Sequence, residues 1–281
     1  MLVSAGGSVP KKYRFLFHQF TFIKTAVKKL LPPLNILALV GVLVMNYLAT
    51  ALPIAGRTPA EVSDMFPTLF TPAGFTFAIW GIIYLLLIGF ALYQVRFFNR
   101  ELPVFLEKTG WLFVLSCVAN AAWLPAFHYL QIGLSLLIML VLLGSLMAIY
   151  LRINDGQTII STAERWLVGL PFSVYLGWIT VATIANISIL FSHLGWNGEP
   201  GGPQFWTVMV IAAAIIIGLL ALLRRQDSGF ALVIIWALYG IFSKRIHDLS
   251  TADGMVEMAA AIGMAILGLG VLYLIFRRIQ R

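Results

Sequence analysis

Long apolar runs recur along this chain, and they constrain its fold more than any other feature. A helix that crosses a bilayer needs about 20 mostly apolar residues, whereas a membrane β-barrel shows segments of about ten alternating residues. Only 11% of the 281 residues are charged, against about 25% in soluble domains. We therefore predict an all-α, polytopic membrane helix bundle with about eight transmembrane helices, at residues 36–52, 73–95, 109–127, 129–151, 166–192, 204–223, 229–243 and 256–276.

The lysines and arginines fall mostly on one side of these spans. Of the nineteen, all but Arg57, Lys244 and Arg245 lie in the N-terminal segment, in the loops on its side of the bundle, or at the C-terminus. Positively charged loops stay in the cytoplasm. We therefore predict a multi-pass protein of the cell (plasma) membrane with both termini cytoplasmic. The net charge of +8 has the same origin, so we expect no nucleic-acid partner.

The N-terminal segment, residues 1–34, contains no Asp or Glu and mixes lysines with Phe and Tyr. Such a composition indicates a basic cytoplasmic arm that lies on anionic lipid. A cleaved targeting segment is the alternative, because Ala49-Thr50-Ala51 resembles a signal-peptidase site. More than 30 residues would then precede the apolar region, which is long for such a signal.

The interiors of the first seven predicted spans contain no Asp, Glu, Lys or Arg, and Glu257 lies near the start of the eighth. Buried charges mark most ion pumps and ion-coupled transporters, so this pattern argues against an ion-driven pump. Cys117 is the single cysteine, which excludes an intrachain disulfide framework and a thiolate metal site.

The spans hold aromatic and amide side chains instead. Residues three or four positions apart share one face of a helix, and three such sets occur: Phe77, Trp80 and Tyr84; Asn120 and Trp123; and Trp178, Ala182 and Asn186.

These sets allow two interpretations. Asn120 and Asn186 could simply hydrogen-bond between helices, and tryptophans often form a belt at the membrane interface. The belt suits Trp111 and Trp196, but Trp80 and Trp178 lie several residues inside their spans. Inward-facing tryptophans without a charge favour a pocket for a flat, largely apolar ligand.

Three stretches carry a family resemblance. The first is Thr71-Pro72-Ala73-Gly74-Phe75-Thr76-Phe77-Ala78-Ile79-Trp80-Gly81-Ile82-Ile83-Tyr84; the second is Asn120-Ala121-Ala122-Trp123 with Phe127; the third is Leu170-Pro171 with Tyr175, Trp178, Ala182-Thr183 and Asn186. Together they resemble the tryptophan-rich sensory protein family, also called the TspO/translocator protein family. The chain departs from the family pattern at Ala73, where a second proline is usual, and at Phe75, where Trp is usual.

Family members usually end after five helices, whereas this chain continues for three more. We therefore divide it into a basic arm (1–34), a TspO-like five-helix core (35–192) and a C-terminal three-helix extension (193–281). The pairs Ala259/Gly263 and Ala261/Ala265 in the extension indicate close helix packing. The motifs give the extension no chemistry.

The resemblance implies an apolar pocket that opens toward the loop after the first helix, and porphyrins, haem or sterol-like molecules as its ligands. The protein would be a sensor, receptor or carrier. We expect it to lie in membrane lipid and to form a homodimer, and we expect neither a covalent cofactor nor a metal. Matched by motif, the ligand-binding residues are Phe77, Trp80, Tyr84, Asn120, Trp123, Trp178 and Asn186. The loop 53–72 would cover the pocket, with Pro72, Gly74 and Phe75 as lid residues and Arg57 as a candidate partner for a propionate.

Two alternatives remain open. The resemblance also implies an enzyme that degrades porphyrins in light, with Trp80 and Trp178 beside the macrocycle. No Ser/His/Asp set is visible, because His18, His128, His193 and His247 are scattered. A permease or scaffold subunit is the other alternative, since three extra helices could dock a partner.

Overall fold

The computed structural model describes residues 29–52, 54–98, 100–247 and 254–280, and this part of the chain contains helices but no strands. Eight helical segments in it are long and apolar enough to cross a membrane, which confirms the all-α polytopic fold. They are α2 (Leu31–Ala51), η2 (Gly74–Ala78) with α4 (Ile79–Val95), α5 (Val104–His128), α6 (Ile132–Ile153), α7 (Thr162–Glu164) with η3 (Arg165–Gly169) and α8 (Leu170–His193), α9 (Gly202–Arg225), α10 (Ser228–His247) and α11 (Met255–Ile279).

Each predicted span corresponds to one of these segments, and the ends differ for local reasons. Helix α2 begins at Leu31 rather than at residue 36, because prolines occupy its first turn, where the missing N–H would be unpaired in any helix. Helix α10 continues to His247, four residues beyond the predicted end. It is therefore 20 residues long, enough to cross a bilayer.

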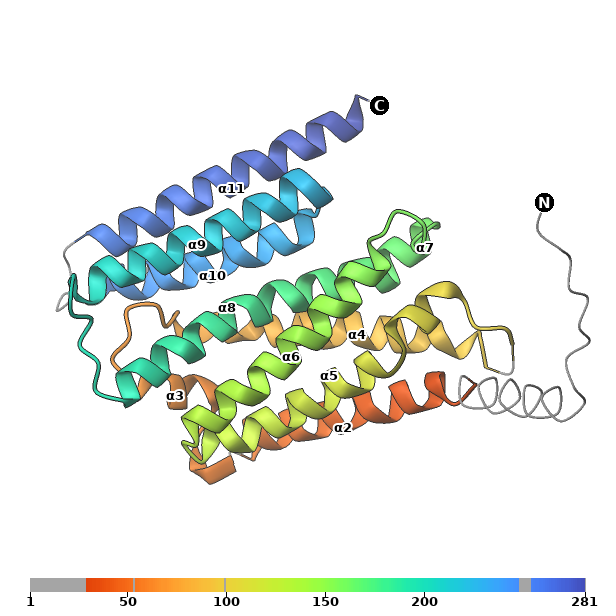
Figure 1. Cartoon of the computed structure of the whole chain (residues 1–281), viewed down its shortest axis with the longest axis horizontal. Coiled ribbons are helices and arrows are strands. Elements are labelled where there is room, and N and C mark those ends of the chain that lie inside the picture. The colour runs from red at the N-terminus through yellow and green to blue at the C-terminus, as the bar shows by residue number, and fades with distance from the viewer. Residues whose placement is uncertain (1–28, 53, 99, 248–253, 281) are drawn as a thin grey trace, which may run out of the picture.

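The helices form two groups (Figure 1). Helices α2, α4, α5, α6 and α8 make a bundle, and α9, α10 and α11 form a layer on its α8 side. A Cβ on Gly177 of α8 would lie 3.1 Å from Cβ of Val233 and 3.3 Å from the carbonyl oxygen of Phe230, both on α10. Glycine at this position lets the two helices approach closely, as in many membrane helix pairs.

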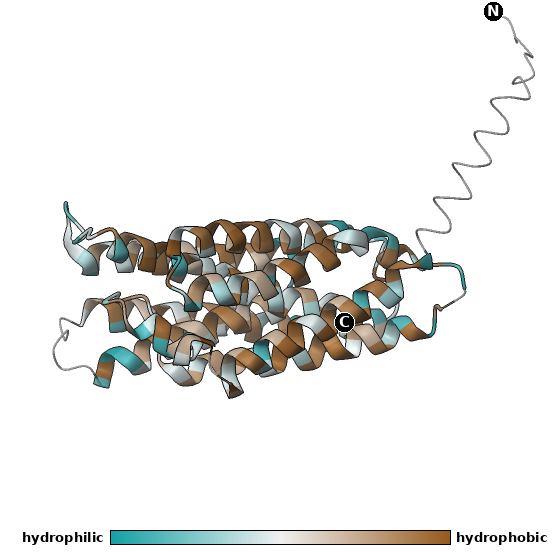
Figure 2. Ribbon diagram, turned by 90° about the horizontal axis from the view of Figure 1, so that it is seen from below, coloured by the Kyte–Doolittle hydropathy of each residue, from teal (hydrophilic) through white to brown (hydrophobic). Residues whose placement is uncertain are grey.

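Apolar residues cover the flanks of the helices, and polar residues collect at both ends (Figure 2). Leucines at the flanks are largely exposed, among them Leu37 at 67%, Leu85 at 69% and Leu223 at 72%. A soluble protein rarely exposes so much contiguous apolar surface. This surface is suited to lipid tails.

Buried amides join the core helices to one another. Asn35 on α2 donates to Gln94 on α4 (2.8 Å), and Asn46 on α2 donates to Asn120 on α5 (3.0 Å). Asn120 in turn donates to the hydroxyl of Tyr175 on α8 (2.8 Å). Polar pairs between membrane helices contribute roughly 0.6–2 kcal/mol each. Asn120 therefore forms hydrogen bonds between helices, which is one of the two interpretations that its sequence context allows.

Charged residues lie at the ends of the spans. Gly110, with φ +43° and ψ −137°, breaks α5 after its first turns and separates Glu107 and Lys108 from the membrane-spanning part. At the far end of α10, Lys244 and Arg245 lie within the last helical turn rather than in the predicted loop. Arg245 is only 5% exposed, so the sequence analysis missed one buried cation.

Hydrogen bonds connect the basic loops at one end of the bundle. Arg225 donates to the carbonyl of Asn154 (2.8 Å), and Arg278 donates to the carbonyl of Gln226 (2.9 Å). Lys108 forms an ion pair with Asp155 and holds the pKa of that carboxyl well below its usual value. The loop after α4, the loop after α6, the α9–α10 loop and the C-terminal end of α11 thus share one end of the molecule (Figure 1).

The shared basic end gives a topological prediction. Because Lys- and Arg-rich ends remain cytoplasmic, reporters fused at Gly156 and Gln226 should read cytoplasmic, and reporters fused at Ala60 and Gly198 should read external. A reporter assay in intact cells measures both states. The same reading at Gly198 and Gln226 would mean that α9 does not cross the membrane.

Candidate ligand-binding site

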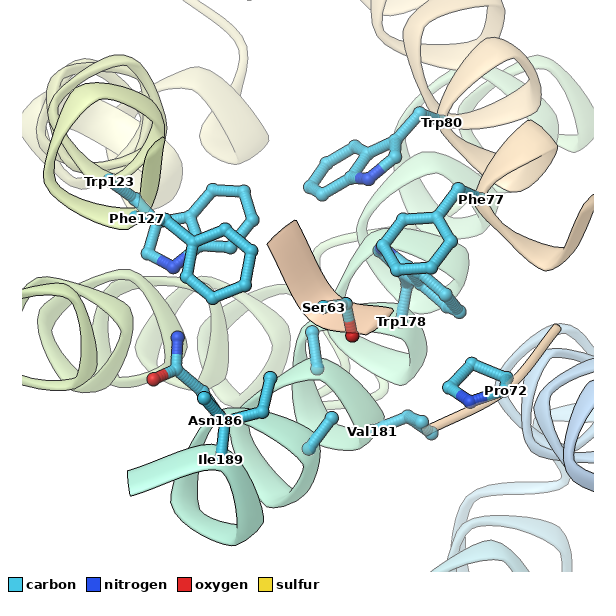
Figure 3. A pocket seen from close by; sticks show the side chains of 12 residues that line it. Ser63, Pro72, Phe77, Trp80, Trp123, Phe127, Trp178, Val181, Asn186 and Ile189 are labelled. Carbon is cyan, nitrogen blue, oxygen red and sulfur yellow. The ribbon is translucent and has the colours of Figure 1, made fainter. Parts of the chain in front are cut away.

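A small internal cavity lies between α4, α5 and α8, next to the short helix α3 (Pro59–Asp64) in the loop after α2. Aromatic side chains dominate it: Trp123 and Phe127 on α5 lie across the cavity from Trp80 and Phe77 (Figure 3). The complete lining is Ser63, Pro72, Phe77, Trp80, Trp123, Phe127, Trp178, Val181, Ala182, Ala185, Asn186 and Ile189.

Helical spacing explains the α8 wall. Trp178, Ala182 and Asn186 recur every four residues and all line the cavity, as the periodicity predicts. The rings of Trp80 and Trp178 meet edge to face, with centroids 6.2 Å apart. Tyr84 stacks behind Trp80 at 5.5 Å and does not itself line the cavity.

Three buried N–H donors of the lining residues have no hydrogen-bond partner among the described residues. They are Nε1 of Trp123, Nε1 of Trp178 and Nδ2 of Asn186. The Oδ1 atom of Asn186 is occupied, since it accepts from Ser135 (3.2 Å). An unmade hydrogen bond at a buried donor costs roughly 1–3 kcal/mol. Three residues of the cavity wall therefore carry donors without a partner, and all of the lining side chains are uncharged.

The cavity is small in this structure. Its volume is about 30 Å³, whereas pockets that hold a drug-sized ligand measure roughly 300–1,000 Å³. A volume of this size holds about one or two water molecules. A larger ligand can enter only if aromatic side chains or the lid move.

The structure brings together most of the residues that the motifs identified. Phe77, Trp80, Trp123, Trp178 and Asn186 line the cavity, together with Pro72 of the lid. Tyr84 and Asn120 lie behind this lining, and Gly74, Phe75 and Arg57 are not part of it. Trp111 and Trp196, assigned to the membrane interface, are 52% and 40% exposed.

Ser63 is a lining residue that the sequence analysis missed. It is brought to the cavity by α3, whose first turn is closed by a capping box: Thr58 accepts from the backbone N–H of Glu61, and Glu61 accepts from that of Thr58. The spacing Thr-x-x-Glu followed by a helix is a recognisable sequence signal. Val181, Ala185 and Ile189 were also missed, because aliphatic residues on a buried helix carry no distinguishing signal.

The lid is held by the C-terminal extension. The backbone N–H of Ala73 donates to the carbonyl of Gly240 (3.0 Å), and Nε1 of Trp236 donates to the carbonyl of Thr76 (2.9 Å). Gly240, whose carbonyl accepts the first bond, and Trp236, which donates the second, both lie on α10. The segment that carries Pro72, Phe77 and Trp80 is therefore fixed to α10.

Two further contacts strengthen this attachment. Phe75 is 44% exposed and packs against α10, with its ring 5.6 Å from that of Trp236 and 5.7 Å from that of Tyr239. Lys244 near the end of α10 forms an ion pair with Asp64 at the end of α3. Phe75 thus lies on the side of the lid segment that faces the extension, whereas a Cβ on Gly74 would lie 3.8 Å from Cβ of Ala60 on α3.

Gly240 provides a test of this attachment. A Cβ at this position would lie 2.0 Å from Oγ1 of Thr76 and 3.0 Å from Cβ of Pro72. Gly240→Ala should push the lid away from α10 and lower stability by about 1–3 kcal/mol, as overpacking does elsewhere. Thermal unfolding in detergent and amide hydrogen exchange at residues 73–78 measure the effect.

Gly144→Ala is the matched control, because a Cβ there meets nothing within 4 Å. It should leave both measurements close to those of the unchanged protein. Equal effects of the two substitutions would show that the lid does not rest on α10.

No three His, Cys, Asp or Glu side chains in the described part of the chain lie close enough to share a metal ion.

The fold and the cavity define a multi-pass helical membrane protein with an internal aromatic pocket. A family model described as TSPO-like protein matches residues 32–273. The chain belongs to this TSPO-like family. The match continues through α9 and α10 and into α11, well past residue 192 where the motifs end. No curated protein and no solved structure matches the chain.

Proposed function

We propose that this protein is a membrane sensor, receptor or carrier that binds a planar, largely apolar ligand of the porphyrin, haem or sterol-like class. The observation that carries the proposal is the cavity itself. Three tryptophans line it, and two of them, with Asn186, carry buried N–H donors that have no partner among the described residues. The family membership supports the same conclusion. We also propose that the basic end of the bundle faces the cytoplasm of a cell membrane, since this side carries most of the positive charge.

The lining selects for the chemistry of the ligand. A flat ring that stacks on an aromatic side chain gains roughly 0.5–1.5 kcal/mol beyond the burial of its area. The free N–H groups of Trp123, Trp178 and Asn186 would then bond to acceptors on the ligand. A charged group among these neutral side chains would be costly to bury. The buried part of the ligand should be uncharged and carry an acceptor, and the carboxylates of a tetrapyrrole should stay at the mouth.

Binding must be coupled to opening of the lid. A cavity of about 30 Å³ is far smaller than any tetrapyrrole or sterol. Pro72, Phe77 and Trp80 lie on the segment that α10 holds. The free energy needed to loosen this segment is therefore subtracted from the free energy of ligand binding. The extension thereby takes part in setting the affinity.

Substitution of the pocket tryptophans tests the proposal. Trp80→Leu or Trp178→Leu removes a stacking surface, and the loss of about 1.4 kcal/mol should weaken protoporphyrin binding about tenfold. Trp111→Leu and Trp196→Leu are matched controls on exposed tryptophans and should change affinity by less than about twofold. Titration followed by the absorbance of the porphyrin gives the four affinities. Equal effects at all four positions, or none at any, would contradict the proposal.

Trp178→Phe separates the hydrogen bond from the stacking. This substitution keeps an aromatic ring but removes the Nε1 donor that has no partner in the structure. If the donor bonds to the ligand, affinity should fall by about three- to tenfold, because a net hydrogen bond contributes roughly 0.5–1.5 kcal/mol. An affinity for protoporphyrin that is unchanged by this substitution would mean that only the ring surface matters.

The contact between Trp80 and Trp178 favours one second function, light-dependent breakdown of a bound porphyrin. Two indoles whose centroids are 6.2 Å apart would lie beside the macrocycle that absorbs the light. Illumination of the porphyrin-bound protein tests this function. Loss of porphyrin absorbance that requires both tryptophans would establish the enzyme, and stable absorbance would leave the binding protein.

A further inference from the structure

A second cavity opens at the basic end, at the junction of the core and the extension. Its volume is about 910 Å³. It is lined by the end of α6, by η3 and the start of α8, by the α9–α10 loop and by the end of α11. Four arginines contribute to its lining: Arg165 from η3, Arg224 and Arg225 from the end of α9, and Arg278 from α11.

The cavity is strongly positive. Asp227 is its one carboxylate among the described residues that line it, and its oxygens are already engaged. They accept from the hydroxyl of Tyr150 (2.8 Å), the hydroxyl of Ser173 (2.5 Å) and the backbone N–H of Phe230 (3.0 Å). Asp227 therefore serves to join α6, α8 and α10, and the charge that faces the cavity is that of the four arginines.

Two of these arginines have side chains that are free to bind a ligand. The guanidinium groups of Arg225 and Arg278 each donate to a backbone carbonyl, whereas those of Arg165 and Arg224 make no hydrogen bond or ion pair within the described residues. The guanidinium group presents parallel N–H donors that match the oxygens of a phosphate. The Oγ atom of Ser228 is also buried, lines the cavity and has no partner among the described residues.

Apolar side chains of the lining reach the outer surface. Leu232 is 52% exposed and Trp166 is 63% exposed, and both contribute to the cavity wall. A site that combines clustered arginines with exposed apolar side chains at the end of a membrane bundle suits an amphiphile with a negative head. A free phosphate or another small soluble anion would make no use of the apolar wall.

We propose that this cavity binds the phosphate headgroup of an anionic phospholipid, with the acyl chains lying against Leu232 and Trp166. The headgroup would contact Arg165 on the core side and Arg224 on the extension side. It would then hold the two parts of the protein together at the end opposite the lid. A ligand that binds only the folded state stabilises it in proportion to the logarithm of its concentration over its Kd.

The test uses the purified full-length protein and phosphatidylglycerol, with phosphatidylcholine as the neutral comparison. Native mass spectrometry counts the bound lipid, and thermal unfolding measures the stabilisation. The variant is Arg165→Gln with Arg224→Gln. The matched control is Arg100→Gln with Arg277→Gln, which removes two exposed arginines from the same end but outside the cavity.

We expect phosphatidylglycerol to remain bound where phosphatidylcholine does not, and to raise the unfolding temperature. The cavity variant should weaken its binding at least about tenfold, which corresponds to 1.4 kcal/mol, and the control should weaken it less than about twofold. Arg165→Lys with Arg224→Lys should fold normally and recover part of the affinity, which separates a lost site from a misfolded protein.

Three results would overturn the proposal. Equal losses in the variant and its control would mean attraction to the basic end in general. Unchanged binding in the variant would place the lipid elsewhere. Inorganic phosphate or glycerol phosphate that displaces the lipid at equal concentration would show that the cavity recognises a soluble phosphate and not a lipid.

Discussion

The interior of a bilayer offers no water to pair with polar groups, and this constraint determines most of the structure. Each helix satisfies its own backbone, so a buried side-chain amide or hydroxyl must find its partner on another helix. The pair of Asn35 with Gln94 and the contact of Asn120 with Tyr175 obey this requirement. The cavity between α4, α5 and α8 is a concentrated exception, with three unpaired donors around one small space. A buried N–H donor without a partner lowers stability, so these three donors are suited to a ligand that accepts hydrogen bonds from them.

Helix α10 links the two sites that the structure contains. Near its C-terminal end, Gly240 and Lys244 hold the lid of the aromatic cavity through a backbone hydrogen bond and an ion pair. At its N-terminal end, Ser228 lines the basic cavity. Helices α9, α10 and α11 are therefore attached to the rest of the bundle at both of its ends. A change in the packing of α10 would affect the lid at one end and the arginine cluster at the other.

Much of the fold could be predicted because membrane spans are long and apolar by necessity. The pocket face of α8 could be predicted for a similar reason, since a helical period places Trp178 and Asn186 on one side. The contact of α10 with the lid could not, because Thr76 and Trp236 are 160 residues apart and neither carries a signal of its partner. The burial of Arg245 was missed because a charged residue normally ends a predicted span. The small volume of the cavity depends on how aromatic rings pack, which no periodicity describes.

The central claim is that the unpaired N–H groups of the aromatic cavity meet the ligand. Indole-¹⁵N labelling of the eight tryptophans allows each N–H to be followed by NMR while the full-length protein is titrated with protoporphyrin. The account predicts large shifts at Trp123 and Trp178. It predicts little change at Trp196 and Trp206, whose Nε1 atoms already donate to backbone carbonyls of the loop between α8 and α9. Saturation of binding with the Trp123 and Trp178 signals unmoved would contradict it.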